Sequence, residues 1–355
     1  MTPKPTIRTI AERAGVSPMT VSRALNGARY VAAEKRKQIR AIARQLGYRP
    51  NPSARQLRAW RGPKEMDCRE FIALLIEKKD PEWANSWKHR SYVAGVQRRA
   101  TQFGYKVQQV WVYEPGWNVG RIRRLLTAAN IRGTVLFPNH YQEIPDDILS
   151  LVARHSCAVL GGQPSKSPFH FAAIDDFASA RTAARQALAR GYRRPGLALL
   201  GWIDELIDRR YSAGFMSVQQ DLPARERLPV LRLSSFSPEE FVRWYTKHRP
   251  DVIITHNRRI AVDEWLRPLR VSVPRDVGWI TLDVIPGDDQ VSGLDTRSEF
   301  VGAAALDLVL GQMQRDETGF PEFQKGVFIE GVWREGSTVR KTFSKSAKAA
   351  RVEEA

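Results

Sequence analysis

From Phe71 onward the chain alternates short apolar runs with amphipathic stretches, and this alternation limits its possible folds more than any other feature. The apolar runs predict strands, and they read FIALLIE, KVQQVWVY, GTVLF, CAVLGG, RPGLALLG, PVLRL, DVIITH and DVGWITLD. The stretches between them, such as SYVAGVQRRATQFG, ASARTAARQALARGY and FVGAAALDLVLGQMQ, have the apolar spacing of helices. Strand followed by helix, repeated, predicts an α/β core with parallel sheets and helices on both faces. The pattern is long enough for two such lobes.

The first 50 residues follow another pattern, without strand-like runs, and predict three short helices. These helices are Ile7–Ala14, Pro18–Leu25 and a third over residues 33–46. Ser17 can accept a hydrogen bond from the start of the second helix, and Pro18 fits its first turn. Gly15 can adopt the positive φ that a tight turn between helices needs. The first two helices therefore predict a helix-turn-helix.

The second helix has an apolar face and a polar face. Val21, Ala24 and Leu25 share the i, i+3, i+4 spacing that packs a helix against its neighbours. The other face carries, in chain order, Pro18, Met19, Thr20, Ser22, Arg23 and Asn26. A recognition helix enters the DNA major groove by its N-terminal end, where an arginine can bond to a guanine edge. We therefore expect Arg23 to read bases. For Thr20, Ser22 and Asn26 we expect phosphate contacts.

Positive charge is concentrated in the same region of the chain. Residues 1–64 contain fifteen Lys or Arg and two Glu, so they hold +13 of the net charge of +18. A small basic module joined to a larger, nearly balanced one is typical of a nucleic-acid binder that carries a separate sensing or assembly domain.

Several function classes lack support in the sequence. No stretch approaches the roughly 18 apolar residues of a membrane span, and MTPKPTIRTIAERAG lacks the apolar core of a secretory signal. We therefore expect a cytoplasmic, nucleoid-associated protein without membrane contact.

Cys68 and Cys157 lack metal or CxxC spacing and are interpreted as idle thiols. The chain has no G-x-S-x-G, P-loop, GxGxxG or HExxH motif and its six histidines are scattered, so we expect no catalytic residue, metal or cofactor.

A resemblance sharpens the expectation for the N-terminal region. The stretch from TIRTIAERAGVS through TVSRALN and LGYRPN to ARQL resembles, without a gap, the DNA-binding headpiece of the LacI/GalR family of bacterial transcription regulators. The resemblance implies that Pro18, Met19 and Arg23 read bases. It also implies that Ala54 and Leu57 lie on a hinge helix that enters the minor groove. One departure is Ala32, where the family usually has a Ser or Thr cap; losing that cap should cost about 1 kcal/mol.

The predicted hinge helix has a physical consequence of its own. A helix of seven or eight residues is marginal in water because nucleation is costly, so it should form only when it is docked on DNA beside its dimer mate. Leu57 could then insert as an apolar wedge between base steps and kink the duplex.

The remainder of the chain resembles, less closely, the periplasmic-binding-protein-like core of the same family, through AIDDFASARTAARQALARGYRRPGLALLG, YSAGF, VPRDVGWITLD and EFVGAAALDLVL. This implies two lobes with a ligand cleft between them. Candidate effector-binding residues are Trp83, Trp87, Arg210, Tyr211, Asn257, Arg258 and Asp283. Trp83 and Trp87 could stack on a sugar ring or a base, although packing between the lobes or within the core is the favoured alternative for both.

The core departs from the family at two positions that bear on the ligand. Tyr211, beside Arg210, stands where the family commonly has arginine, and Asn257-Arg258 replaces a usual Asn-Asp pair. Asp283 keeps the usual ligand-facing acid. A neutral sugar held by the family's usual polar set therefore cannot be assumed, and an anionic sugar or no ligand are alternatives.

The sequence thus predicts an all-α helix-turn-helix headpiece (1–50), a hinge helix and linker (51–66), a two-lobed α/β periplasmic-binding-protein-like core with parallel sheets (67–339) and a disordered basic tail (340–355). The expected function is a homodimeric repressor that reads a near-palindromic operator in double-stranded DNA and responds to a small-molecule, sugar-like effector. An alternative is a regulator of the same fold that responds to a partner protein or to no small molecule. An enzyme and a nonspecific DNA-coating protein are less favoured alternatives.

Overall fold

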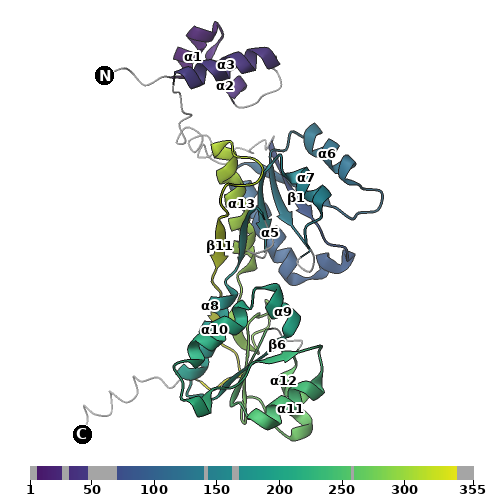
Figure 1. The fold of residues 1–355 in the computed structure, drawn as a ribbon, viewed down its shortest axis with the longest axis vertical. Coiled ribbons are helices and arrows are strands. Elements are labelled where there is room, and N and C mark those ends of the chain that lie inside the picture. Colours follow the sequence, from purple (N-terminus) through teal and green to yellow (C-terminus); the bar gives the residue numbers. More distant parts are fainter. Residues whose placement is uncertain are drawn as a thin grey trace, which may run out of the picture. The chain divides into compact units, whose positions relative to one another are not determined.

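The computed structural model describes residues 6–25, 32–46, 70–139, 143–161, 168–256 and 260–341. The chain divides into two compact units, residues 1–66 and 67–355, and each is described by itself (Figure 1). Several predicted features lie outside the described residues: Asn26, the hinge helix with Ala54 and Leu57, Cys68, the pair Asn257 and Arg258, and the tail from residue 342. The predictions for these residues stay predictions.

The first unit contains the three predicted helices, which are α1 (Ile7–Ala14), α2 (Pro18–Leu25) and α3 (Ala33–Gln45). α1 is followed by Gly15 at φ 64°, as the predicted turn requires. The Ser17 hydroxyl accepts the Thr20 N–H at 3.1 Å, which confirms the predicted cap of α2. Ala32 precedes α3 without a side-chain cap, and α3 ends one residue earlier than predicted.

These helices enclose a small core made of the predicted faces. The buried residues come from all three helices and are Ile10, Ala11, Ala14, Val21, Ala24, Ile39 and Ala43. Leu25, Ile42 and Leu46 pack against this cluster while partly exposed. The apolar periodicity of the sequence therefore predicted the packing of this unit correctly.

The second unit is built on two sheets. The first sheet has the order β11-β5-β4-β3-β1-β2 and all its pairs are parallel. Its strands are β1 (Glu70–Ile76), β2 (Tyr105–Trp111), β3 (Gly133–Phe137), β4 (Ser156–Leu160), β5 (His170–Ile174) and β11 (Gly326–Ile329). The helices of this lobe are α5 (Trp87–Gln102), α6 (Val119–Ala128), α7 (Asp146–Val152) and α13 (Ser298–Arg315), with a 3-10 turn η1 (Pro81–Asn85). We call this part the N-lobe.

The second sheet has the order β12-β10-β9-β8-β6-β7, and its pairs are parallel except for the antiparallel pair β10 and β12. Its strands are β6 (Pro195–Leu200), β7 (Leu231–Leu233), β8 (Val252–Thr255), β9 (Gly278–Thr281), β10 (Ser292–Asp295) and β12 (Val332–Arg334). The helices are α8 (Asp176–Ala189), α9 (Gly201–Leu206), α10 (Arg210–Gln219), α11 (Pro238–His248) and α12 (Val262–Leu266), with 3-10 turns η2 (Ala224–Glu226) and η3 (Arg267–Leu269). We call this part the C-lobe.

The chain passes between the two lobes three times. It crosses from β5 to α8, returns from β10 to α13, and crosses again from β11 to β12. Two parallel-sheet lobes with helices on both faces confirm the α/β core that the sequence predicts (Figure 1).

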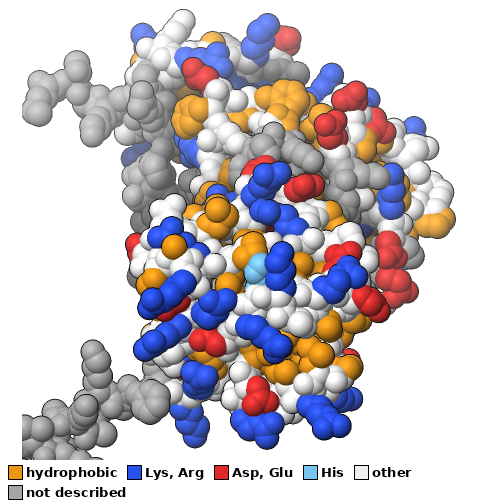
Figure 2. Space-filling view, turned by 60° about the horizontal axis from the view of Figure 1, so that its bottom comes forward, with side chains coloured by type: hydrophobic (Ala, Val, Ile, Leu, Met, Phe, Trp, Pro, Cys, Tyr) orange, Lys and Arg blue, Asp and Glu red, His pale blue; other side chains and the backbone are white. Residues whose placement is uncertain are grey.

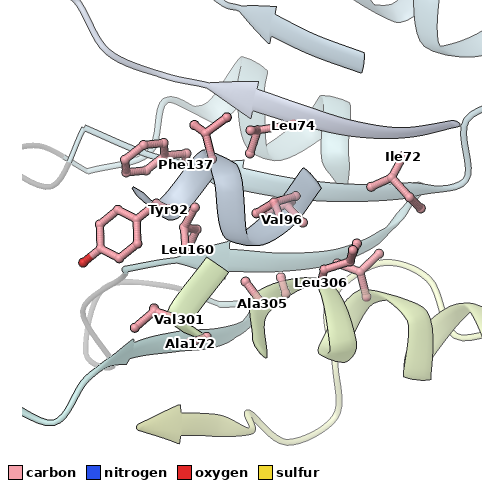
Figure 3. Close-up of a cluster of buried hydrophobic side chains, with 14 of the residues drawn as sticks. Ile72, Leu74, Tyr92, Val96, Phe137, Leu160, Ala172, Val301, Ala305 and Leu306 are labelled. Carbon is pink, nitrogen blue, oxygen red and sulfur yellow. The ribbon is translucent and has the colours of Figure 1, made fainter. Parts of the chain in front are cut away.

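One apolar cluster of the N-lobe lies where α5 and α13 cross the sheet (Figure 3). The helices meet at two glycines: a Cβ on Gly95 would collide with the backbone carbonyl of Glu299, and one on Gly302 with that of Tyr92. Tyr92 itself lies at the edge of the cluster, and its hydroxyl points away from the apolar side chains (Figure 3). The close crossing therefore fixes the position of α5 against α13. The first turn of α5 contributes to the site described next.

Candidate functional site

The surface of α2 is the first candidate site, because the sequence places the DNA contacts there. Val21 and Ala24 are fully buried, whereas Met19 is 62% exposed and Pro18 is also exposed. The N-terminal end of α2 therefore presents Pro18 and Met19 outward, as the groove-entering end of a recognition helix must.

Among the polar residues of α2, the structure describes the side chain of Thr20. The Thr20 side chain is half-buried, and its Oγ1 lies 2.9 Å from Ser17 Oγ, so this hydroxyl takes part in the cap of the helix. Ser22 and Arg23 belong to α2, but their side chains are not among those described. Their expected roles at bases and phosphates, and that of Asn26, stay predictions.

Basic side chains surround the described part of this unit. Arg8, Arg13, Lys37, Arg40 and Arg44 are all exposed. Figure 2 shows one face of the molecule, on which Lys and Arg side chains are numerous and acidic ones fewer. Because residues 1–64 hold +13 of the net charge of +18, the densest positive charge belongs to the helical unit.

The second candidate site is a polar cluster where the two lobes meet. Lys88 is the second residue of α5 in the N-lobe, and Asp283 follows β9 in the C-lobe. Lys88 Nζ lies 2.9 Å from Asp283 Oδ2, so the two side chains form an ion pair between the lobes. Thr296 Oγ1 donates to Asp283 Oδ1 at 3.2 Å and lies 3.1 Å from Ser298 Oγ. These contacts hold the carboxylate in place.

Burial and the opposite charge act against each other on both partners of this pair. Burial disfavours the ammonium group of Lys88, but the Asp283 carboxylate outweighs burial and raises the pKa of Lys88 above its usual value. Burial also raises the pKa of the Asp283 carboxyl, and the Lys88 charge opposes that rise. Each charge of the pair therefore stabilises the other against burial.

Tyr211 and Asp176 form a second pair beside the first. Tyr211 is 6% exposed and its hydroxyl donates a hydrogen bond to the Asp176 carboxylate, which is 9% exposed. Burial raises the pKa of Asp176 to about 6, although the Tyr211 hydrogen bond and the nearby Lys88 and Arg210 charges oppose the rise. The Asp176 carboxyl thus titrates nearer neutrality than an ordinary aspartate.

Tyr92 completes the cluster from α5. Its hydroxyl is hydrogen-bonded to Ser298, and burial raises the pKa of Tyr92 to about 12 although the Lys88 charge opposes the rise. The cluster therefore contains Lys88, Tyr92, Asp176, Tyr211, Asp283, Thr296 and Ser298, and we call it the interlobe cluster.

Arg210, another predicted effector residue, lies next to this cluster but in a pair of its own. Its Nη2 donates to Asp175 Oδ1 at 3.1 Å, and its guanidinium carbon lies 4.2 Å from the centroid of the Phe328 ring. Asp175 also caps α8 by accepting the Ala178 N–H. Arg210 therefore joins the start of α10 to the segments that cross between the lobes.

The two predicted tryptophans differ in their surroundings. Trp83 packs against the N-lobe core while partly buried, and its carbonyl oxygen lies 2.9 Å from His89 Nδ1. Trp87 is half-buried, and Lys88 Nζ lies 5.8 Å from its ring centroid. Of the predicted effector residues, the structure thus brings Tyr211 and Asp283 into the interlobe cluster, with Arg210 and Trp87 beside it.

Sequence reasoning missed Lys88, Tyr92 and Asp176. Asp175 caps α8, whereas its neighbour Asp176 is buried in the cluster. Lys88 carries no motif at all. Its only signal is its position next to Trp87.

The pKa of Asp176 leads to a prediction about stability. Its carboxyl has a pKa of about 6 in the folded chain and about 3.9 when unfolded, so its stabilising contribution is complete below about pH 4 and is lost as the pH rises through 6. Asp176→Asn should therefore raise the free energy of unfolding by about 1 to 3 kcal/mol at pH 7.5 and by much less at pH 4.5. Urea unfolding at both pH values measures the difference, with the exposed Asp221→Asn as control. A gain that is equal at both pH values would contradict the prediction.

Two other site classes find no support in the described residues. Across these ranges, no group of three or more His, Cys, Asp or Glu side chains could hold a metal ion. Within the same ranges, no helix is long and apolar enough to cross a membrane.

Comparisons with known proteins bear on both sites. Residues 6–51 match the model of the bacterial regulatory proteins of the lacI family, and this stretch contains α1, α2 and α3. The chain is also 23% identical over 338 residues to the HTH-type transcriptional repressor PurR of Klebsiella pneumoniae (strain 342), covering 88% of this chain and 92% of that protein.

Solved structures share the fold over nearly the whole length. The lac repressor dimer bound to operator and the anti-inducer ONPF has a TM-score of 0.53 at 19% identity, covering 96% of this chain and 100% of that one. The complex of the transcriptional regulator CelR with cellobiose has a TM-score of 0.55 at 16% identity, covering 94% and 99%. Both similarities concern the fold, and the match over the three helices concerns the family. Residues 6–51 therefore match the lacI family of bacterial regulatory proteins, and the chain as a whole is similar in sequence and fold to DNA-binding transcriptional regulators.

Proposed function

We propose that this chain is a cytoplasmic, sequence-specific transcriptional repressor. It binds a near-palindromic operator as a homodimer and is controlled by a small molecule at the junction of its lobes. The observation that carries the proposal is the exposed N-terminal end of α2, set on a buried three-helix core and surrounded by basic side chains. Repression, and not activation, is the activity in the printed name of the PurR relatives.

Within this proposal the residues of α2 have separate tasks. Pro18, Met19 and Arg23 contact base edges in the major groove. Thr20, Ser22 and Asn26 contact phosphates and so position the helix without reading sequence. Ala54 and Leu57 enter the minor groove on the hinge helix, where Leu57 acts as the apolar wedge.

The effector is proposed to bind where the lobes meet. Tyr211 and Asp283 lie there with Trp87 and Arg210 beside them, and Trp83, Asn257 and Arg258 complete the candidate set. The solved relatives were determined with cellobiose and with ONPF, which supports a sugar-like ligand class for this chain too. Ligand binding would then change the arrangement of the lobes and, through it, the spacing of the two hinges.

One observation favours the second candidate function, a regulator that responds to a partner protein or to no small molecule. The Asp283 carboxylate, which would receive a ligand, is already paired with Lys88 of the same chain. Thermal unfolding of the protein against a panel of metabolites separates the two candidates, because a ligand of the folded state raises Tm by mass action.

Selection of DNA from a random library by the full-length protein, at near-physiological salt, tests the main proposal. The expected result is enrichment of a palindrome of about 14 to 20 base pairs, which corresponds to two half-sites about one helical turn apart. Enrichment of no sequence, with or without added metabolites, would instead indicate a nonspecific DNA-coating protein.

Arg23→Ala should change which sequence is selected. Losing a bidentate contact to guanine removes about 1 to 3 kcal/mol of discrimination, so the preference at one base pair per half-site should relax. Arg13→Ala, at an exposed position of α1, removes the same charge and should weaken binding to all sequences equally. An unchanged selected motif for the Arg23 variant would show that Arg23 does not read bases.

A further inference from the structure

The strongest feature of the molecule that the proposed function does not use is the ion pair between Lys88 and Asp283. Its partners come from different lobes, and their side chains are only 25% and 15% exposed. Each is held by its own element: Lys88 lies in the first turn of α5, and Asp283 is held by Thr296 in the crossing segment before α13. The contact can therefore persist only while the lobes stay together.

Because of this pair, the closed arrangement of the lobes needs no ligand to neutralise the Asp283 carboxylate. In a closed junction without Lys88, the Asp283 carboxylate would be buried without a counter-charge, which is strongly unfavourable. With Lys88 present the acid is neutralised by the chain itself, and its second oxygen is satisfied by Thr296. Asp176 is likewise satisfied by Tyr211. The acids of the interlobe cluster thus have partners before any ligand arrives.

We propose that Lys88 is an internal substitute for a ligand: it pairs with Asp283 and latches the lobes together in the absence of an effector. A ligand that uses Asp283 must displace the Lys88 ammonium. Such a ligand must then satisfy the Asp283 carboxylate with hydrogen-bond donors or a charge of its own. The regulatory consequence rests on the proposed function, whereas the closure of the lobes does not.

The latch can be tested by energy transfer between two dyes, one on each lobe. The dyes are attached at Lys106→Cys in the N-lobe and Lys247→Cys in the C-lobe, both exposed positions, in a Cys68→Ser background. Cys157 can stay because it is fully buried, and burial raises the pKa of its thiol. Labelled subunits are diluted into excess unlabelled protein so that only distances within one chain are recorded.

Without ligand, the latched chain should give one narrow population of high transfer efficiency. Lys88→Met removes the charge and nearly keeps the length, so the open population should rise at least tenfold. Lys88→Arg keeps the charge and should stay closed. Arg99→Met is the matched control, since Arg99 lies on the same helix but pairs at 2.7 Å with Asp307 of α13 in the same lobe, and it should leave the distance unchanged.

Three outcomes would overturn the latch: an open wild-type chain, a closed Lys88→Met variant, or equal opening in the Met and Arg variants. If Lys88→Met fails to fold, Asp283→Asn gives the same test from the other partner, because it removes the charge and keeps the shape. The measurement uses neither DNA nor an effector. Absence of sequence-specific DNA binding would therefore refute the proposed function and leave this result intact.

Discussion

Replacing Gly95 by alanine should lower the free energy of unfolding of the two-lobed unit by about 3 kcal/mol. The new Cβ would collide with the backbone carbonyl of Glu299, and a backbone atom within a helix cannot move aside as a flexible side chain can. α5 and α13 would have to separate, which opens the cluster that contains Val96, Val301 and Ala305 (Figure 3). For a unit of this size, the expected fall in Tm is about 6 to 12 °C by calorimetry.

A glycine on the same helix pair supplies the control. At Gly311 of α13 an added Cβ would approach only the end of the Arg315 side chain, which can move. Gly311→Ala should therefore be neutral or stabilise by up to about 1 kcal/mol, because alanine favours a helix. If Gly95→Ala were as stable as Gly311→Ala, the backbone contact between the helices would not be as close as described.

Ile10→Ala should strongly weaken specific DNA binding without changing the stability of the two-lobed unit. Ile10 is fully buried in the three-helix core, and removing such a side chain costs about 2 to 5 kcal/mol. A unit this small has a low free energy of unfolding, so most molecules of the variant should have this unit unfolded. Because only the folded unit binds DNA, the apparent affinity for the selected operator should fall by about tenfold or more, measured by fluorescence anisotropy.

Ile7→Ala is the matched control for this experiment. Ile7 has the same side chain on the same helix but lies at the edge of the core, partly exposed, so the loss of affinity should be much smaller. Calorimetry should show the same Tm for the two-lobed unit in both variants, because the three helices form a separate compact unit. Equal affinities for Ile10→Ala and the parent chain would contradict the assigned core.

The three helices were predictable from the sequence because their signals are local. Ser17 and Pro18 mark one start, Gly15 marks one turn, and the apolar spacing sets the buried faces within a few residues. The eight strand-like runs were also found, because each is an apolar run between helix-patterned stretches. β5, β10, β11 and β12 were missed although they are no shorter than β7, and their pairing partners, not their own pattern, make them strands.

The interlobe cluster was only partly predictable. Tyr211 and Asp283 stood at positions that the family resemblance marks, and both lie in the cluster. Lys88 and Asp176 could not be found in the same way, because their importance depends on how two lobes from distant parts of the chain meet. An ion pair between such residues has no spacing in the sequence that would reveal it.

The three passages of the chain between the lobes also mean that neither lobe is one continuous stretch of the gene. β11 forms an edge of the first sheet and β12 an edge of the second, and both come after residue 325. A premature stop codon shortly before this point would therefore damage both lobes at once, and no single cut of the chain yields one whole lobe. Insertions and deletions can therefore accumulate in the loops of either lobe, but the two lobes must be inherited together.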